Sequence, residues 1–293
     1  MDAEILVVIV TFNGMEWMER CIGSVRASSM EADILAIDNG STDGTPEWLE
    51  KQGVEVIRNS SNLGFGAANN IGLQRALAEG YSFVYLLNQD AWVRPDTFKL
   101  LADASEDDPL FGILSPVQYD AGGKKMDRLF ARHCRRRVRA HRHDSIVEVP
   151  FVMAAHWMIT RGCLLKTGGF SPAFKQYGED ENYIHRARWW GYKSGVVPAA
   201  GAIHDRAGRQ PSPEKRMFLK CNGSVARVSK PAGGAFLRLL WESIRLAGTA
   251  LVNLDKAPIR FIGTLWHRYP ELMRARRNSR RPHAFLEEAY NSR

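Results

Sequence analysis

The sequence predicts an α/β fold in which a mostly parallel central sheet carries helices on both faces. Two observations predict it. Continuous apolar runs rich in β-branched residues, such as ILVVIV at 5–10, are typical of strands buried on both faces. These runs alternate with helical segments through the first half of the chain, and each helix returns the chain to the edge where the next parallel strand starts.

The elements of the first half are expected in a regular order. The second helix has Pro46 in its first turn, and the third helix ends at Gly80. The expected strands are 5–10, 32–38, 54–59, 83–90 and 111–120, and the expected helices are 15–28, 46–52, 63–80 and 95–105.

The second half is less regular. Between 124 and 142, nine Lys or Arg residues stand against one acid, Asp127, and we expect a basic loop over 123–147. Strand-like alternation returns at 147–160. The remaining expected elements are a short helix at 161–170 that stops at glycine, a helix at 177–193, a strand at 194–205, a loop at 208–216, an amphipathic helix at 235–254 and a basic tail at 268–281.

The composition is that of an ordinary globular protein. Of the 293 residues, 45% are apolar and 25% are charged, which excludes a disordered, collagen-like or coiled-coil chain and supplies ample material for a core. Basic residues exceed acidic residues by eight. This excess suggests an anionic partner, which could be nucleic acid, a membrane surface or a phosphorylated small molecule.

The cysteines and the first residues indicate a cytosolic protein. Cys21, Cys134, Cys163 and Cys221 are scattered without a CxxC pair, so we expect reduced thiols and no disulfide framework. The chain starts MDAEILVVIV, with acids where a signal peptide needs positive charge. The apolar run is also too short to span a bilayer.

Polar residues stand at the carboxyl ends of four expected strands. Ligands of such sheets bind beyond the carboxyl ends of the strands, so this convergence predicts a site at one rim of the sheet. The clusters are Thr11-Phe12-Asn13, Asp38-Asn39-Gly40-Ser41, Asn62 and Asn88-Gln89-Asp90.

Two of these clusters suit a nucleotide. Asp38 and Asn39 offer the acceptors and donors that read a nucleobase edge, or they only stabilise a tight turn. Asn62, Gly64 and Asn69 lie where a loop enters a helix, a place that favours phosphate; a plain strand-to-helix turn is the alternative. The spacing departs from the GxGxxG fingerprint, so a nicotinamide cofactor is not expected.

Carboxylates and a histidine further along suit metal and acid–base chemistry. Asp90 could hold Mg²⁺ or Mn²⁺, which prefer oxygen ligands, or cap the following helix. Glu179-Asp180-Glu181 opens a helix and could supply a general base or only oppose the helix dipole. His204 ends the last strand, where it could be a metal ligand or a structural histidine.

Five motifs, in this order and spacing, resemble family 2 glycosyltransferases of the GT-A fold, and most of all bacterial rhamnosyltransferases of surface polysaccharide synthesis. The resemblance covers roughly residues 4–208. It implies an inverting transfer from a nucleotide-diphosphate donor to a saccharide hydroxyl. We expect L-rhamnose from a dTDP-sugar, with a UDP-hexose or UDP-galactofuranose donor as the alternative. The motifs are VVIVTFNG, AIDNGSTDGT, NSSNLGFGAANNIG, YLLNQDAWVRPD and GGFSPAFKQYGEDENYIHRARWWGYK.

The resemblance also implies roles for single residues. Asp180 would be the catalytic base, and Asp90 with His204 would hold Mg²⁺ or Mn²⁺. Asn88 stands where the family's DxD metal motif has its first acid. The residues that would hold the donor are Thr11, Asn13, Asp38, Asn39, Asn62, Gly64, Asn69 and Asn88. The residues that would lie on the acceptor side are His156, Trp157 and Glu179. The indole of Trp157 could stack on a sugar ring or be a buried core residue instead.

The basic segments fit an acceptor carried on a polyprenyl diphosphate at an anionic membrane surface. The helix at 236–254 could lie in the membrane interface, or pack on the domain while the basic loop is solvated or disordered. We expect a GT-A domain over 1–225, with a donor half of about 1–120 and an acceptor half of about 121–225, and a basic helical extension over 226–293. The expected location is cytoplasmic and peripheral on the inner face of the membrane.

Two other classes of function remain open at this point. Charge alone suggests a nucleic-acid-binding protein, but the basic residues gather in one loop and the tail while the polar rim is neutral or acidic. A catalytically inactive nucleotide-sugar-binding scaffold would bind donor without turnover. The presence of both Asp90 and Asp180 favours an enzyme.

Overall fold

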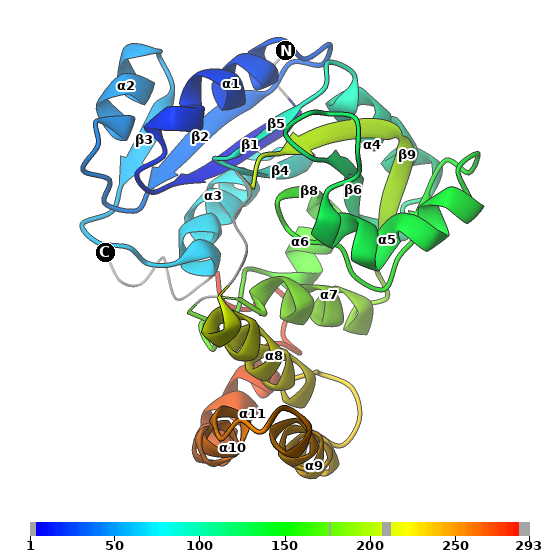
Figure 1. Cartoon of the computed structure of the whole chain (residues 1–293). Helices are drawn as coiled ribbons and strands as arrows, with labels where there is room; N and C mark the ends of the chain where they lie inside the picture. The colour runs from blue at the N-terminus through cyan, green and yellow to red at the C-terminus, as the bar shows by residue number, and fades with distance from the viewer. Residues whose placement is uncertain (1–3, 176, 207–211, 287–293) are drawn as a thin grey trace.

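A twisted sheet of nine strands forms the centre of the molecule (Figure 1). The computed structural model describes residues 4–175, 177–206 and 212–286. In these residues the strands follow the order β3-β2-β1-β4-β8-β6-β9-β5, and β7 pairs with β9. The strands are β1 (Ile5–Thr11), β2 (Asp33–Asp38), β3 (Glu55–Arg58), β4 (Phe83–Asn88), β5 (Ala91–Val93), β6 (Phe111–Tyr119), β7 (Val147–Glu148), β8 (His156–Thr160) and β9 (Lys193–His204).

The helices of the described chain cover both faces of the sheet and continue into a helical unit below it (Figure 1). They are α1 (Met15–Arg26), α2 (Thr45–Lys51), α3 (Phe65–Glu79), α4 (Thr97–Asp107), α5 (Arg128–Ala140), α6 (Arg161–Thr167), α7 (Glu179–Trp189), α8 (Pro213–Val228), α9 (Ala235–Asn253), α10 (Ala257–His267) and α11 (Tyr269–Asn278).

The sheet is parallel where the sequence alternates strand and helix. β3, β2, β1 and β4 pair in parallel, and β6 pairs in parallel with β9. β8 runs antiparallel between β4 and β6, and the short β5 runs antiparallel to β9. The predicted α/β class with helices on both faces is therefore confirmed, with antiparallel strands in its second half.

Two layers of buried side chains separate the sheet from its helices. Leu6 and Val8 of β1 belong to the core layer that also holds Leu73 of α3. Val7 and Ile9 belong to the opposite layer, which includes Met18 of α1. Successive side chains of a strand point to opposite faces, so the continuous apolar run of β1 serves both layers.

The basic segment 123–147 contains a helix that the sequence analysis did not predict. In α5 the side chains of Phe130, Cys134 and Val138 are buried at intervals of four residues. The carboxylate of Asp127 accepts hydrogen bonds from the first backbone N–H groups, those of Leu129 and Phe130. Three apolar residues on one stripe are enough to dock a helix whose remaining face is cationic.

Two further expectations need correction. The run 147–160 is not one strand, because residues 149–155 separate β7 from β8. In the predicted loop 208–216, the last residues form the start of α8, while 208–211 lie outside the described residues. The basic tail 268–281 forms α11, as expected for a helical extension, and its Leu272 packs into the core shared with the other C-terminal helices.

Helices α8 to α11 enclose a third core. Val225, Leu239, Leu265 and Leu272 come from four successive helices and pack together there with Phe174. The chain then returns to the main domain, where Leu286 enters the core layer of α3. The boundary proposed at 225/226 falls inside α8, which belongs to this C-terminal helical unit.

Candidate active site

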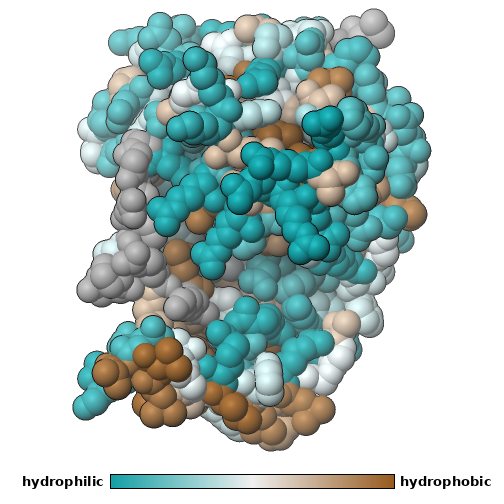
Figure 2. All heavy atoms as spheres, turned by 45° about the vertical axis from the view of Figure 1, so that its right-hand side comes forward, coloured by the Kyte–Doolittle hydropathy of each residue, from teal (hydrophilic) through white to brown (hydrophobic). Residues whose placement is uncertain are grey.

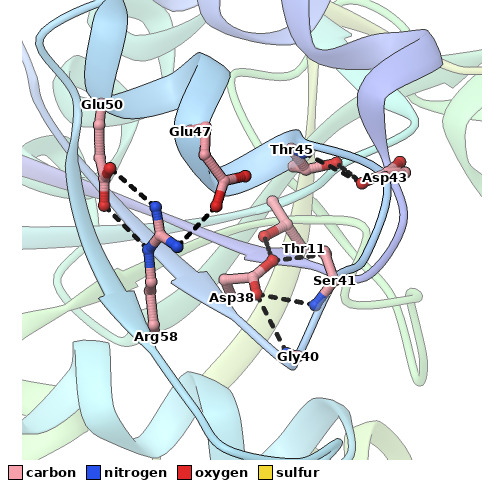
Figure 3. A network of polar contacts seen from close by, with 9 residues as sticks. All are labelled: Thr11, Asp38, Gly40, Ser41, Asp43, Thr45, Glu47, Glu50 and Arg58. Atoms are coloured by element: carbon pink, nitrogen blue, oxygen red, sulfur yellow. Dashed lines mark hydrogen bonds and ion pairs between the residues drawn. The ribbon is translucent and has the colours of Figure 1, made fainter.

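The carboxyl ends of β1 and β2 lie side by side, with Thr11 opposite Asp38 (Figure 3). Both residues are buried, and Thr11 Oγ1 donates to Asp38 Oδ1 at 2.8 Å. Asp38 Oδ2 accepts from the backbone N–H groups of Gly40 and Ser41 at 3.0 and 2.9 Å. Asp38 therefore fixes the turn that follows β2, as the alternative turn interpretation predicts.

Asn13 ties the same turn to the loop after β1. Its φ of 48° lies in the left-handed region, and Asn adopts this region more readily than most residues. Asn13 Oδ1 accepts from Thr42 N at 2.8 Å, and Asn13 N donates to Ser41 Oγ at 2.8 Å. Asn39 is buried beside them, where its Oδ1 accepts from Asn59 Nδ2 at 3.0 Å.

An ion-pair cluster holds α2 against β3 next to this turn (Figure 3). Arg58 binds Glu50 through two parallel hydrogen bonds of 2.9 and 2.8 Å and binds Glu47 at 2.7 Å. Its guanidinium fork is exposed, so the cluster adds rigidity more than stability. It keeps the first residues of α2 close to the turn of Asp38.

Gln89 is a residue of the rim to which the sequence analysis gave no role. Its Oε1 accepts from Phe12 N at 2.8 Å, and its Nε2 donates to Phe12 O at 3.2 Å. A Cβ atom at Gly14 would lie 2.4 Å from Gln89 Oε1, so this contact requires glycine there. Gln89 therefore joins the loops after β1 and β4. Hydrogen bonds between a side-chain amide and the backbone of a distant residue cannot be recognised in a single sequence.

Asp90 and His204 come together just beyond β4. Asp90 Oδ1 lies 3.4 Å from His204 Nε2, and their side chains are 13% and 4% exposed. The antiparallel pairing of β5 with β9 places Ala91 opposite His204, which brings these two residues together. His204 Nδ1 is buried and has no hydrogen-bond partner among the described residues.

His156 and Trp157 do not face a site, which corrects the acceptor role implied for them. His156 is fully buried, with Nδ1 2.9 Å from Tyr85 Oη and Nε2 3.0 Å from the carbonyl of Ile203. Burial, followed by the charge of His204, lowers the pKa of His156 to about 3, so the ring is neutral. Trp157 is fully buried and stacks on Phe170. Both are core residues of β8.

The loop before α3 touches the segment that leads to α7. Gly64 has a φ of 84°, and a Cβ atom there would lie 2.4 Å from Lys175 O. Asn62 Oδ1 accepts from Gly64 N at 2.9 Å, which closes the turn. Asn69 is buried and donates to Phe65 O of its own helix at 2.9 Å. Asn62 and Asn69, two of the predicted donor residues, thus form hydrogen bonds within their own segments of the chain.

Asn70, which the sequence analysis did not single out, makes the longer-range contact. Asn70 Oδ1 accepts from Phe170 N at 2.6 Å, and its Nδ2 donates to Phe170 O at 3.0 Å. This pair of bonds fixes the glycine-rich turn before α7 on α3. The sequence does not indicate which of the adjacent residues Asn69 and Asn70 faces the neighbouring segment.

Glu179 and Asp180 open α7 in a mostly apolar setting. Glu179 is buried, and its Oε2 has no hydrogen-bond partner among the described residues. Burial, then the charge of Asp180, raises the pKa of Glu179. Burial also raises the pKa of Asp180, to about 6, although the backbone N–H of Glu181 donates to Asp180 Oδ1 at 2.8 Å. Burial therefore outweighs the stabilising effect of the helix start.

One backbone segment links this acid pair to the rim. The backbone N–H of Ala154 bonds the Asp180 carboxylate, which lowers its pKa against the effect of burial. The next residue, Ala155, accepts from Asn88 N at 3.1 Å. Asp180 and Asn88 therefore bind adjacent residues of the segment that leads into β8, at the edge where β4 ends.

The Asp90–His204 pair fits a divalent cation. Two neighbouring ligands at right angles, each about 2.1 Å from a cation, are separated by about 3 Å, close to the observed 3.4 Å. Among the described residues, no group of three or more His, Cys, Asp or Glu side chains could hold a metal ion. A cation bound here would take its other ligands from water and phosphate oxygens, as Mg²⁺ commonly does.

Comparisons with known proteins identify relatives of this chain. The family model described as glycosyl transferase family 2 matches residues 6–164. The N-acetylglucosaminyl-diphospho-decaprenol L-rhamnosyltransferase of Mycobacterium tuberculosis is 28% identical over 244 residues, which are 70% of this chain and 78% of that protein. The undecaprenyl-phosphate mannosyltransferase of Micrococcus luteus is 28% identical over 105 residues, which are 34% of this chain and 43% of that protein.

Solved structures share the fold at low sequence identity. Staphylococcus aureus TarS 1–349 in complex with UDP superposes with a TM-score of 0.59 and 15% identity, covering 98% of this chain and 91% of that one. The mannosyltransferase PcManGT of Pyrobaculum calidifontis, in complex with GDP-Man and Mn²⁺, superposes with a TM-score of 0.57 and 17% identity, covering 94% and 86%. The family model matches more than half of the chain, so the chain belongs to glycosyl transferase family 2 and has the GT-A fold.

Proposed function

We propose that this protein is an inverting glycosyltransferase that transfers a sugar from a nucleotide-diphosphate donor to a lipid-linked saccharide. The observation that carries the proposal is the position of Asp180, a partly buried carboxyl with a raised pKa, at the sheet edge that also holds Asp90 and His204. This edge offers a base for the acceptor and a cation site for the donor within one region.

The residues of the rim suggest how the donor would bind. The turn formed by Asp38 and Asn39, held by Thr11 and Asn13, would receive the base and ribose. Asn62, Gly64, Asn69 and Asn88 would shape the remainder of the donor site. Asp90 and His204 would hold Mg²⁺ or Mn²⁺, which when bound neutralises charge on the departing diphosphate.

The acceptor side follows from Asp180. A sugar hydroxyl is a poor nucleophile until a carboxylate accepts its proton. A carboxylate with a raised pKa is a stronger base than an ordinary aspartate and still ionises near neutral pH. Its buried neighbour Glu179 would lie on the acceptor side. Direct attack opposite the leaving group needs one base and no enzyme nucleophile, so the product has the inverted anomeric configuration.

The substrates are proposed from the relatives. The mycobacterial relative is a rhamnosyltransferase that acts on a polyprenyl-diphosphate sugar, and the Micrococcus relative acts on undecaprenyl phosphate. We therefore propose L-rhamnose from a dTDP-sugar as the transferred group and a polyprenyl-diphosphate-linked saccharide as the acceptor. The reaction would take place at a membrane surface on the cytoplasmic side. A UDP-sugar is the second candidate donor, since TarS binds UDP and UDP-GlcNAc on the same fold.

A transfer assay with the full-length protein tests this function. We expect a rhamnosylated product, detected by mass spectrometry, from dTDP-rhamnose, an N-acetylglucosaminyl-diphospho-polyprenol and Mn²⁺, and NMR should show the inverted anomeric centre. Chelation of the metal should abolish transfer, and Asp90→Asn should raise the Mn²⁺ concentration for half-maximal rate by about tenfold or more. His141→Gln, on an exposed histidine, is the matched control.

Three outcomes would contradict parts of the proposal. Full activity in the presence of chelator would show that the reaction does not need a cation at Asp90 and His204. A product with retained anomeric configuration would exclude the mechanism with a single base. Donor binding without turnover for every nucleotide-sugar tested, from dTDP- to UDP-linked sugars, would identify the chain as an inactive binding scaffold.

A further inference from the structure

Helix α9 is apolar on two faces: Leu239 and Leu246 are buried in the third core, and a second apolar stripe is exposed. Leu237, Trp241, Ile244 and Leu251 recur at intervals of three, four or seven residues and form one stripe, and their side chains are 71%, 64%, 66% and 76% exposed. A helix on the surface of a soluble domain normally turns such a stripe toward the core. Here it points away from the molecule.

An ion cluster lies on the inner face of α9, between its buried apolar residues. Glu242 is buried and binds Arg227 of α8 and Arg245 of its own helix, with its Oε2 accepting from these two arginines at 3.0 and 2.8 Å. Arg245 also donates to Ser224 Oγ of α8 at 2.8 Å. This ion cluster fixes the rotation of α9, so the apolar stripe cannot turn inward without breaking it.

The exposed apolar surface extends beyond one helix. Figure 2 shows hydrophobic side chains gathered at the end of the molecule formed by the C-terminal helices. The side chains that are at least 40% exposed there are Phe236, Leu237, Trp241, Ile244, Leu251, Val252, Leu254, Ile259 and Trp266. A contiguous patch of this kind marks a protein or membrane contact surface.

The charges beside this patch indicate its partner. Residues 235–286 contain ten Lys or Arg and three Asp or Glu. Lys256 and Arg260 flank Ile259, are exposed, and form no ion pair with the described residues. Two copies of such a cationic surface repel each other, whereas an anionic lipid surface attracts it. No helix in the described part of the chain could cross a membrane.

We propose that the outward face of α9, together with Leu254 and Ile259, is a docking surface for a bilayer that contains anionic lipids. The apolar stripe enters the boundary between headgroups and acyl chains, and Lys256 and Arg260 bind the headgroups. Trp241 suits the same depth, because an indole has an apolar body and a polar N–H group. This surface is independent of the transfer reaction, and its test requires no activity.

Vesicle sedimentation of the full-length protein tests the surface. We expect binding to vesicles of phosphatidylcholine mixed with phosphatidylglycerol, and weaker binding to phosphatidylcholine alone. The double variant Trp241→Glu/Ile244→Glu should lose about tenfold or more of the binding. Lys256→Glu/Arg260→Glu should lose at least about fivefold on the anionic vesicles only. Leu110→Glu, on an exposed leucine before β6, should bind like the wild type.

Circular dichroism and melting temperature check that each variant folds, and Leu251→Glu/Val252→Glu replaces the first double variant if it does not. The proposal is overturned if the wild type does not bind either kind of vesicle. It is also overturned if sedimentation velocity shows a dimer that Trp241→Glu/Ile244→Glu dissociates, because a second copy would then cover this face.

Discussion

The polar residues of the rim differ in what their side-chain atoms already bind. The oxygens of Asp38, Asn13 and Gln89 accept hydrogen bonds from backbone N–H groups, so these side chains shape the loops. Glu179 Oε2 and His204 Nδ1 are buried without a partner among the described residues. An unpaired buried polar atom costs about 1–3 kcal/mol, and such atoms are expected where a substrate or an ion completes the site.

Asp180→Asn should separate binding from chemistry. The amide keeps the size of the carboxylate but cannot accept the acceptor's proton, so kcat should fall by about 10²- to 10⁴-fold. Donor affinity, measured by calorimetry, should stay within about twofold because the proposed donor site lies at β1 and β2. Asp103→Asn, on an exposed surface aspartate, is the control. A variant with nearly normal kcat would exclude Asp180 as the base.

The pH dependence of the rate should reflect the raised pKa of Asp180. A general base works when it is deprotonated, and burial raises the pKa of Asp180 to about 6, above the ordinary value near 3.9. The rate should therefore fall as pH decreases through about 6, well before an exposed aspartate would protonate. A profile of kcat/KM from pH 4 to 9 measures this limb. A flat profile down to about pH 4.5 would contradict the assignment.

At the scale of the element, helix packing on the sheet depends on a few close approaches. Gly72 of α3 lies against β1, and a Cβ atom there would lie 2.4 Å from Val8 Cγ1. In contrast, nothing lies within 4 Å of a Cβ atom at Gly23 of α1. Both glycines are inside helices, so they differ in packing and not in backbone conformation.

Gly72→Val should destabilise the protein, whereas Gly23→Ala should not. Overpacking at Gly72 should lower the free energy of unfolding by about 1–3 kcal/mol. Alanine at Gly23 should raise it by about 0.5–1 kcal/mol, because alanine favours the helix. Urea unfolding of both variants measures the difference. Equal effects of the two substitutions would mean that α3 does not approach β1 this closely.

At the scale of the molecule, partly buried charges join the C-terminal helices to one another and to α7. Arg227 of α8 binds Glu242 of α9 through two hydrogen bonds and lies 4.0 Å from Glu181, the residue after Asp180. The end of the described chain also returns to the sheet domain, since Gly169 N donates to Ala284 O at 2.8 Å. The helical unit is therefore fastened to the acidic end of α7.

Glu242→Ala should loosen this unit. It removes the shared partner of two arginines, and we expect the free energy of unfolding to fall by about 2–3 kcal/mol, because both arginines keep partial contact with water. Glu271→Ala removes a more exposed ion pair with Arg268 and should cost less than about 1 kcal/mol. Thermal unfolding compares the two, and similar losses would show that the Glu242 cluster does not stabilise the unit.

The sequence by itself determined the fold class and the composition of the rim. Continuous apolar runs, alternating helices and polar residues at strand ends are local patterns, and parallel pairing then brings Thr11, Asp38 and Asn88 to one edge. The same local patterns placed α9 correctly. They did not predict α5, because its many arginines mask the helical spacing of only three apolar residues.

Only the tertiary structure decided which side chains are available at the rim. The sequence could not show that β8 is buried between β4 and β6, and this burial makes His156 and Trp157 core residues. It also could not show which face of α9 turns outward. That choice depends on a buried carboxylate that meets an arginine fifteen residues earlier in the chain. Burial and ion pairing arise between segments far apart in the chain, and no local pattern records them.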